Sequence, residues 1–173
     1  MPPNFDPPIP AVTITPYDNL SMGAGLGSTS LASTAWVSAN RALYIPFRLF
    51  KAATAYKIFV VNGTAVSGNL DLGIYDRTGR RLISTGSTAQ SGTNTIQEIT
   101  FGTPLVLGPG PFYMAMAMDN TTGTTFRRSP GPVQMRVLGM FQEASAFALP
   151  VTATFATIST SYVPMMGIRF FNG

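Results

Sequence analysis

Four carboxylates have a spacing that could support chemistry. Asp71 and Asp76 flank an expected strand, Asp119 ends another, and Glu98 lies in a third. Three aspartates that met at one sheet edge could bind Ca²⁺, which prefers oxygen ligands. A pair of clustered carboxyl groups with perturbed pKa values could hydrolyse a glycosidic bond. The sequence has no dense EF-hand loop, and Asp at a turn commonly bonds its own backbone, so turn capping is our preferred interpretation.

Two residue types that carry much of enzyme chemistry are missing. The 173-residue chain has no cysteine and no histidine. It therefore has no disulfide, thiolate metal site or cysteine nucleophile, and it lacks both the commonest general base at neutral pH and a common zinc ligand. We predict a non-enzymatic protein without a cofactor or a metal site.

The overall composition points to contact with protein. Hydrophobic residues make up 45% of the chain and charged residues 10%, compared with roughly a quarter charged in typical soluble domains. The net charge is +4, but the arginines are scattered, so we expect no direct nucleic-acid binding. The sequence shows neither a secretion signal nor about 18 consecutive apolar residues, which predicts a soluble, unexported protein without a membrane span.

Aromatic, methionine and arginine side chains are further binding candidates. Exposed rings could stack on sugars, but most lie inside strand patterns and are better interpreted as core or interface. The rings concerned are Trp36, Tyr44, Tyr56, Tyr75, Tyr113 and Tyr162. Met114, Met116 and Met118 alternate with alanine, which favours sandwich core over an adaptable contact surface. Arg127 and Arg128 fall in an expected loop, where they could pair with acidic residues of a neighbour or simply be solvated.

The N-terminal residues differ in composition from the rest. Five prolines occur in the first ten residues, and 22–27 is glycine-rich. Proline removes backbone donors and favours extended geometry, so we predict an extended arm over 1–32 that lies along a neighbouring subunit, with a disordered tail as the alternative. The predicted partner-binding residues are Pro2, Pro3, Phe5, Pro7, Pro8 and Ile9 of the arm, together with Arg127 and Arg128.

Residues 33–173 have the pattern of a single all-β domain. Short β-branched and aromatic runs alternate with turn residues, and we find no helical periodicity. Asn62–Gly63 predicts a tight reversal, Asp76–Gly79 a type I turn, and residues 84–94 an exposed loop. Two sequons, at Asn62 and Asn120, are interpreted as turns. Strands are expected at 43–50, 54–61, 66–75, 80–84, 95–101, 112–119, 134–139 and 163–171, and residues 105–111 are expected to be a strand end and a turn. Leu70, Leu72 and Ile74 share one face of their strand. Roughly eight such strands suit an antiparallel, jelly-roll-like β-sandwich.

An ordered series of motifs between Leu43 and Asp119 resembles a β-sandwich module of tailed-bacteriophage virion proteins. The motifs are Ala55-Tyr-Lys-Ile-Phe-Val-Val-Asn-Gly63, Val66-Ser-Gly-Asn-Leu-Asp-Leu-Gly-Ile-Tyr-Asp76, Thr78-Gly-Arg-Arg-Leu82, Ser84-Thr-Gly-Ser87 and Gly110-Pro-Phe-Tyr-Met-Ala-Met-Ala-Met-Asp119. The series covers under half of the chain. Such modules occur in head-decoration, minor tail and fibre proteins.

The resemblance implies a structural part of the virion, made in the host cytoplasm, with no family catalytic residues. We expect a capsid decoration or cement protein that binds neighbouring subunits, above all the major capsid protein, as a homo-oligomer such as a trimer. The alternative is a tail or fibre module that recognises host glycans. A small glycan hydrolase is a third hypothesis, which requires the carboxylates to cluster.

Overall fold

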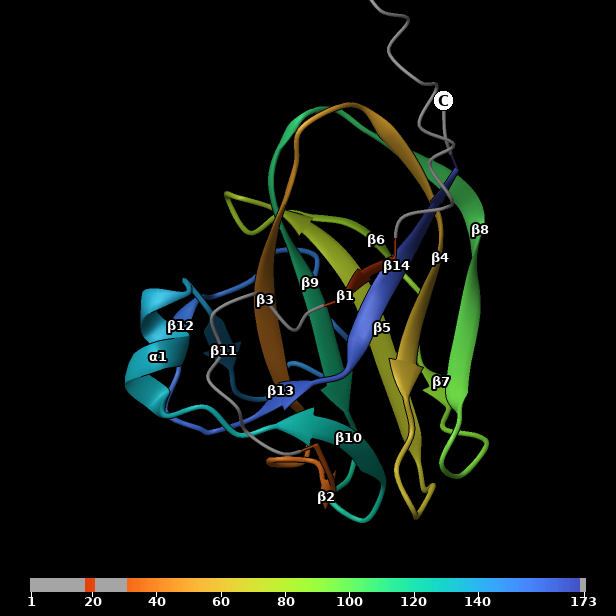
Figure 1. Cartoon of the computed structure of the whole chain (residues 1–173), viewed down its shortest axis with the longest axis vertical. Helices are drawn as coiled ribbons and strands as arrows, with labels where there is room; N and C mark the ends of the chain where they lie inside the picture. The colour runs from red at the N-terminus through yellow and green to blue at the C-terminus, as the bar shows by residue number, and fades with distance from the viewer. Residues whose placement is uncertain (1–17, 21–30, 172–173) are drawn as a thin grey trace, which may run out of the picture.

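The computed structural model describes residues 18–20 and 31–171, which form three antiparallel sheets (Figure 1). The four-stranded sheet has the order β1 (Asp18–Leu20), β14 (Met166–Phe171), β4 (Ala53–Val61) and β8 (Ile96–Leu107). The seven-stranded sheet has the order β12 (Ala156–Thr157), β11 (Phe141–Glu143), β3 (Arg41–Leu49), β9 (Gly110–Met118), β5 (Asn69–Asp76) and β6 (Arg81–Ser84), with β7 (Thr88–Ala89) beside β5. The three-stranded sheet joins β13 (Val163–Pro164), β10 (Thr124–Arg128) and β2 (Ala32–Ala35).

The two larger sheets pack face to face around one apolar core, which confirms the all-β, sandwich-like prediction. Alternation along each strand sends every second side chain inward. Leu70, Leu72 and Ile74 share the inner face of β5, as predicted, and are fully buried. The four-stranded sheet contributes inward side chains such as Ile58 and Ile168 to the same core. The jelly-roll connectivity stays a prediction.

β9 is a central strand and its methionines are core residues, as the alternation predicts. It lies between β3 and β5, and Met114, Met116 and Met118 are buried with the leucines of β5. Its alanines face the other side of the sheet, which is also covered. β11 pairs only with Ala42, Leu43 and Tyr44 of β3, so Pro46 lies past the end of this pairing. Pro46 therefore occupies an edge position on that side, where its missing N–H interrupts no pairing with β11.

The outer face of the seven-stranded sheet is covered by the chain between β11 and β12. Ala146, Leu149 and Phe155 from this segment pack on Tyr44 and Tyr75 of the sheet. We call residues 144–155 the covering segment. It makes β5 unusual, because the six residues from Leu70 to Tyr75 are all buried, whichever way they point.

The predicted reversal at Asn62–Gly63 is wrong. β4 and β5 belong to different sheets, and Asn62 instead forms a backbone bridge with Thr125 of β10. The side chain of Asn62 is fully buried: its amide donates to the Ser91 carbonyl at 2.6 Å and to the Gln97 side chain at 2.9 Å. The Gln90 amide donates back to Asn62 Oδ1 at 3.0 Å. A complete set of buried partners outweighs the local turn preference.

Residues 84–94 are not a fully exposed loop, because they contain β7 and the buried Gln90. The prediction of a strand at 134–139 is also wrong. Residues Pro132–Val137 form helix α1, with Pro132 in its first turn and Gly139 at φ +76° after its end. These are normal helix start and stop residues. Among the described residues, no helix is long and apolar enough to span a bilayer.

The Asp76–Gly79 turn is confirmed. The Gly79 N–H donates to the Asp76 carbonyl at 3.1 Å, and Gly79 has φ +90°. The second sequon also lies at a turn, where Asn120 Oδ1 accepts the N–H groups of Thr122 and Gly123, each at 2.8 Å.

We predict that Gly63→Ala lowers the free energy of unfolding by about 1–3 kcal/mol. A Cβ at Gly63 would clash with Ser33 Oγ and lie 2.5 Å from Thr124 Oγ1. Gly102→Ala is the matched control, because a Cβ there meets nothing within 4 Å and its φ is not positive. Urea denaturation of both variants tests this, and equal midpoints would contradict the account of Gly63.

Candidate functional site

The four carboxylates do not form one site. Asp119 binds Asn69 at the start of β5, and Asp76 ends the same strand, about 23 Å away at about 3.3 Å per residue. Glu98 lies on β8 of the four-stranded sheet, where it pairs with Lys57 at 3.1 Å. The alternative in which Asp71, Asp76 and Asp119 converge on a calcium ion therefore does not hold, and turn capping is the preferred interpretation. Within 31–171, no three His, Cys, Asp or Glu side chains form a group that could hold a metal ion.

Asp76 and Asp119 cap turns, as preferred from sequence. Asp76 Oδ1 accepts the N–H groups of Thr78 at 2.8 Å and Arg80 at 3.1 Å. Asp119 accepts the Asn69 N–H at 2.9 Å and its side-chain amide at 2.8 Å. Partial burial raises the pKa of each carboxyl, but these hydrogen bonds outweigh it, so both pKa values lie below the usual range.

Asp71 anchors the covering segment from beneath. Its side chain is fully buried and accepts the Leu149 N–H at 2.9 Å and the Thr85 hydroxyl at 3.3 Å. Arg81 donates to the Leu149 carbonyl, so both backbone groups of this residue are held. Burial raises the pKa of Asp71, opposed by the hydrogen bonds from Leu149 and Thr85 and by the charge of Arg81. This is an anchoring role that the sequence analysis missed, since nothing near Asp71 in sequence identifies Leu149 as its partner.

Four of the six aromatic candidates are buried: Trp36, Tyr44, Tyr75 and Tyr162. Tyr44 donates to Glu143 at 2.6 Å, and Tyr75 to the Pro150 carbonyl at 2.6 Å. Burial raises the pKa of both phenols. The rings of Tyr44 and Tyr75 bind the covering segment and β11, and those of Trp36 and Tyr162 pack on each other at 5.1 Å, so none of the four can stack on a sugar. The core interpretation is confirmed for these four residues.

A partly open aromatic cluster remains on the outer face. Tyr113, Phe141 and Phe155 are each half-buried. The rings of Phe141 and Phe155 stack at 4.9 Å with an interplanar angle of 21°, and Tyr113 lies 4.9 Å from Phe155. Phe141 and Phe155 were not among the sequence candidates, because they come together only through the return of the chain over the sheet.

Arg127 and Arg128 do not lie in a loop, so that prediction is wrong. They end β10, paired with β13 and in part with β2. Arg127 is half-buried; it lies 5.0 Å above the Tyr162 ring and donates to the Ser161 carbonyl at 3.0 Å. Burial raises the pKa of Tyr162 to about 12. Arg127 is thus engaged within its own chain.

The N-terminal segment meets the sandwich at a sheet edge. Asp18, Asn19 and Leu20 pair antiparallel with Arg169, Ile168 and Gly167 of β14. β1 is the outermost strand of the four-stranded sheet (Figure 1). The other predicted partner-binding residues of the arm, Pro2, Pro3, Phe5, Pro7, Pro8 and Ile9, lie outside the described residues.

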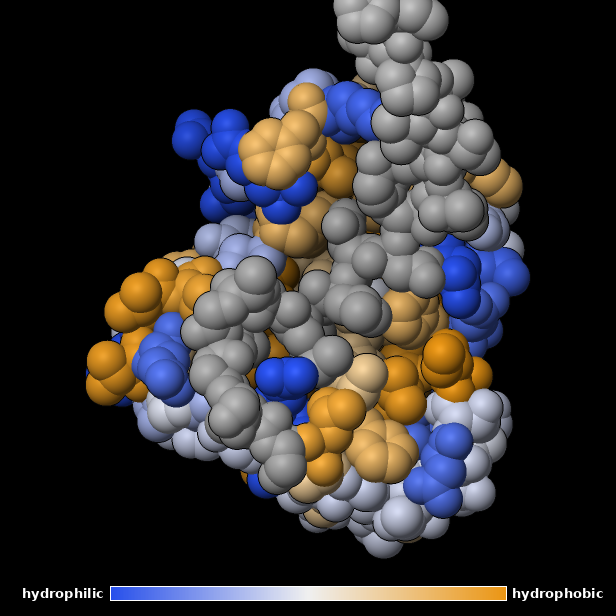
Figure 2. Space-filling view, viewed as in Figure 1, coloured by the Kyte–Doolittle hydropathy of each residue, from blue (hydrophilic) through white to orange (hydrophobic). Residues whose placement is uncertain are grey.

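Several large apolar side chains are exposed, and Figure 2 shows apolar patches on the viewed face. They occur on α1, on the outer side of β8 and β14, on the loop after β3 and on the covering segment. Those at least half exposed are Phe50, Ile96, Val106, Val133, Val137, Val151 and Phe171. Patches of this kind often mark contacts with protein.

Comparison with protein-family models, curated proteins and solved structures finds no match to this chain.

We predict that Asp71→Ala lowers the free energy of unfolding by about 1–3 kcal/mol, because the buried Leu149 N–H loses its acceptor. Asp71→Asn keeps an acceptor and should cost less. Because the folded-state pKa of Asp71 is raised, its contribution to stability is fully present below the unfolded pKa and is lost as pH rises through the folded pKa. Relative to wild type, Asp71→Asn should therefore gain stability from acid to neutral pH.

Asp119→Asn is the control for this pH dependence. The folded-state pKa of Asp119 is lowered, so its contribution is present above the unfolded pKa and is lost as pH falls through the folded value. Urea titrations over this range should show opposite trends for the two asparagine variants. The same trend in both would contradict the assignment for Asp71.

Proposed function

We propose that the chain is a non-enzymatic structural module of a larger protein particle, the virion of a tailed bacteriophage, and that it decorates the capsid. In this role it binds the major capsid protein and neighbouring copies of itself. Binding the assembled shell in preference to its dissociated parts would stabilise the shell by mass action. The sandwich supplies a rigid body, and its N-terminal segment supplies an attachment.

The observation that carries this proposal is the pairing of β1 with β14. Residues Asp18–Leu20 bind by adding a strand to a sheet edge, a mode that uses backbone hydrogen bonds and suits an extended segment. The same three residues can pair with β14 of a neighbouring copy without any change in the contacts. Residues 21–30, which are rich in glycine and serine, are long enough to extend about 33 Å.

Composition and exposure support an assembled protein. Only 10% of residues are charged, and large apolar side chains such as Val137 and Phe50 are 81% and 87% exposed. Such side chains contribute no burial free energy while they face water, whereas an interface with another protein would remove them from water.

Exchange of β1 between copies can be tested by cross-linking, because the chain has no cysteine. Asp18 and Arg169 are directly paired. We expect a mixture of the single variants Asp18→Cys and Arg169→Cys to form a disulfide-linked dimer on mild oxidation. The control mixture pairs Asp18→Cys with Thr121→Cys, an exposed position in the loop after β9.

If only the double variant Asp18→Cys/Arg169→Cys forms a disulfide, and within one chain, then β1 stays on its own sheet and the exchange is disproved. We further expect a chain that lacks the residues before Leu20 to keep its circular dichroism spectrum but to attach poorly to particles. Unchanged attachment would exclude a role for the arm.

Immunogold electron microscopy of intact source particles tests the location. Label spread over the head supports decoration of the capsid. Label confined to the tail would exclude decoration and favour a tail component, and unlabelled particles would contradict a virion protein altogether.

One observation favours the alternative function, a tail or fibre module that recognises host glycans. Tyr113, Phe141 and Phe155 form a half-buried aromatic group of the kind that can stack on sugar rings. A glycan array with the wild-type protein and a Phe155→Ala variant tests it: binding that is lost in the variant would support this function, and an array without signal would reject it.

A further inference from the structure

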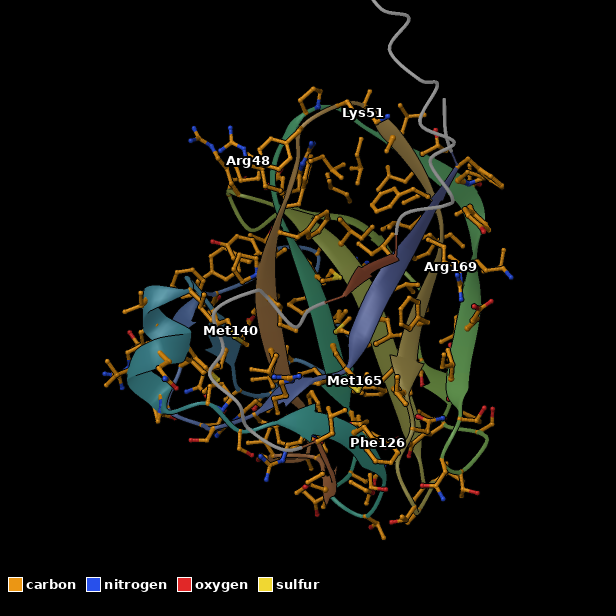
Figure 3. All side chains as sticks on the ribbon, in the orientation of Figure 1. Arg48, Lys51, Phe126, Met140, Met165 and Arg169 are labelled. Carbon is orange, nitrogen blue, oxygen red and sulfur yellow. The ribbon has the colours of Figure 1, made fainter. Side chains whose placement is uncertain are left out.

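One end of the sandwich gathers basic side chains around an exposed ring. The β3–β4 loop carries Arg48, Phe50 and Lys51, and the β5–β6 turn carries Arg77 and Arg80. We call these five residues the basic end. Figure 3 shows Arg48 and Lys51 at the same end of the molecule, and Figure 2 shows hydrophilic and apolar side chains next to each other there.

Strand register brings the two basic segments together. Phe112 of β9 pairs with Phe47 on one side and with Asp76 on the other. Arg48 follows Phe47 within β3, and Arg77 follows Asp76 directly after the end of β5. Neighbouring strands are about 4.8 Å apart, so the Cα atoms of Phe47 and Asp76 lie about 10 Å from each other. The rings of Phe47 and Phe112 are half-buried, 5.6 Å apart, and pack against the core on the inner face of the sheet. Arg48, the next residue of β3, therefore lies on the opposite face.

These two segments hold three arginines and, among their described residues, one carboxylate. That carboxylate, Asp76, pairs with Arg80 at 3.3 Å. Arg48 and Arg77 are exposed and have no ion pair within the described part of the chain. The Arg48 guanidinium lies 5.9 Å from the centre of the Phe50 ring, which is 87% exposed. The basic end thus offers two guanidinium groups beside one apolar anchor.

We propose that the basic end binds an extended acidic segment of a partner protein. Guanidinium groups bind carboxylates in a bidentate manner, and arginine and aromatic side chains dominate protein interfaces. In a polyproline II segment, two acidic residues three positions apart lie on the same side and about 9 Å from each other, close to the spacing of the positions that precede Arg48 and Arg77. An apolar residue between them would reach Phe50.

Three other cations, Lys57, Arg127 and Arg169, are held elsewhere and do not extend the patch into the stripe that a polynucleotide would follow. Lys57 and Arg169 pair with Glu98 on the four-stranded sheet, and Arg127 stacks on Tyr162. A protein segment with a few carboxylates and an apolar residue fits this local arrangement better. The inference rests on the proposed function in that it names a surface and a partner chemistry for assembly, but its test needs no particle.

The probe is a fluorescein-labelled peptide with four Glu-Leu-Ser repeats, and the measurement is fluorescence anisotropy of the full chain. We expect binding that weakens as salt rises from about 50 to about 300 mM. The variant Arg48→Ala/Arg77→Ala should lose about tenfold or more in affinity. Phe50→Ala should lose about threefold or more, because the leucine contact is removed.

Thr121→Glu/Thr122→Glu is the matched control, since it lowers the net charge by the same two units at exposed positions after the opposite end of β9. It should bind within about twofold of wild type. The inference fails if wild type does not bind, or if this control weakens binding as much as the arginine variant. It also fails if heparin or single-stranded DNA at equal charge displaces the peptide at lower concentration than unlabelled peptide does. Each of these results leaves the cross-linking and labelling tests of the proposed function unaffected.

Discussion

The central constraint of this protein is that β5 and β9 are buried on both faces. A strand buried on one face needs one covering layer, but β5 has buried residues from Leu70 to Tyr75 without a break. The four-stranded sheet covers one side, and the covering segment 144–155 covers the other. Because Asp71 points into the second interface, this interface also needs hydrogen-bond donors, and Leu149 and Thr85 supply them. A buried carboxylate thus determines where the covering segment sits.

This arrangement takes the central face of the larger sheet out of contact with ligands. Asp71, Tyr44 and Tyr75 would be attractive site residues from sequence, yet all three are used to hold the chain that covers them. What remains for recognition is the periphery: the side of β14 on which β1 pairs, the loops at the basic end, and the partly open aromatic cluster around Phe155. A rigid sandwich that binds through its edges and loops is the arrangement that the proposed assembly function needs.

A buried polar network joins the sheets at the other end. Asn62 follows β4, Gln97 belongs to β8, and Gln90 follows β7, which pairs with β5 of the larger sheet. Gln90 also donates to the Thr124 carbonyl of β10 at 2.8 Å, so the three-stranded sheet is included. Such a network stabilises only the arrangement of the three sheets in which every buried polar group has its hydrogen-bond partner. It therefore favours this arrangement over others that would leave one of these groups without a partner.

The sequence by itself determined the features that depend on local pattern. Alternation identified the all-β class, the inner face of β5 and the methionine face of β9, and turn chemistry identified the Asp76–Gly79 turn, because these depend on neighbours within a few residues. Tertiary structure alone decided that Asn62 is a buried anchor rather than a hairpin residue, that Arg127 belongs to a strand, and that three aspartates lie apart. It also decided that Asp71 meets Leu149 across 78 positions of sequence. Those outcomes depend on which strands become neighbours, and the free energy that selects them comes from burial and from satisfied polar groups across the whole chain.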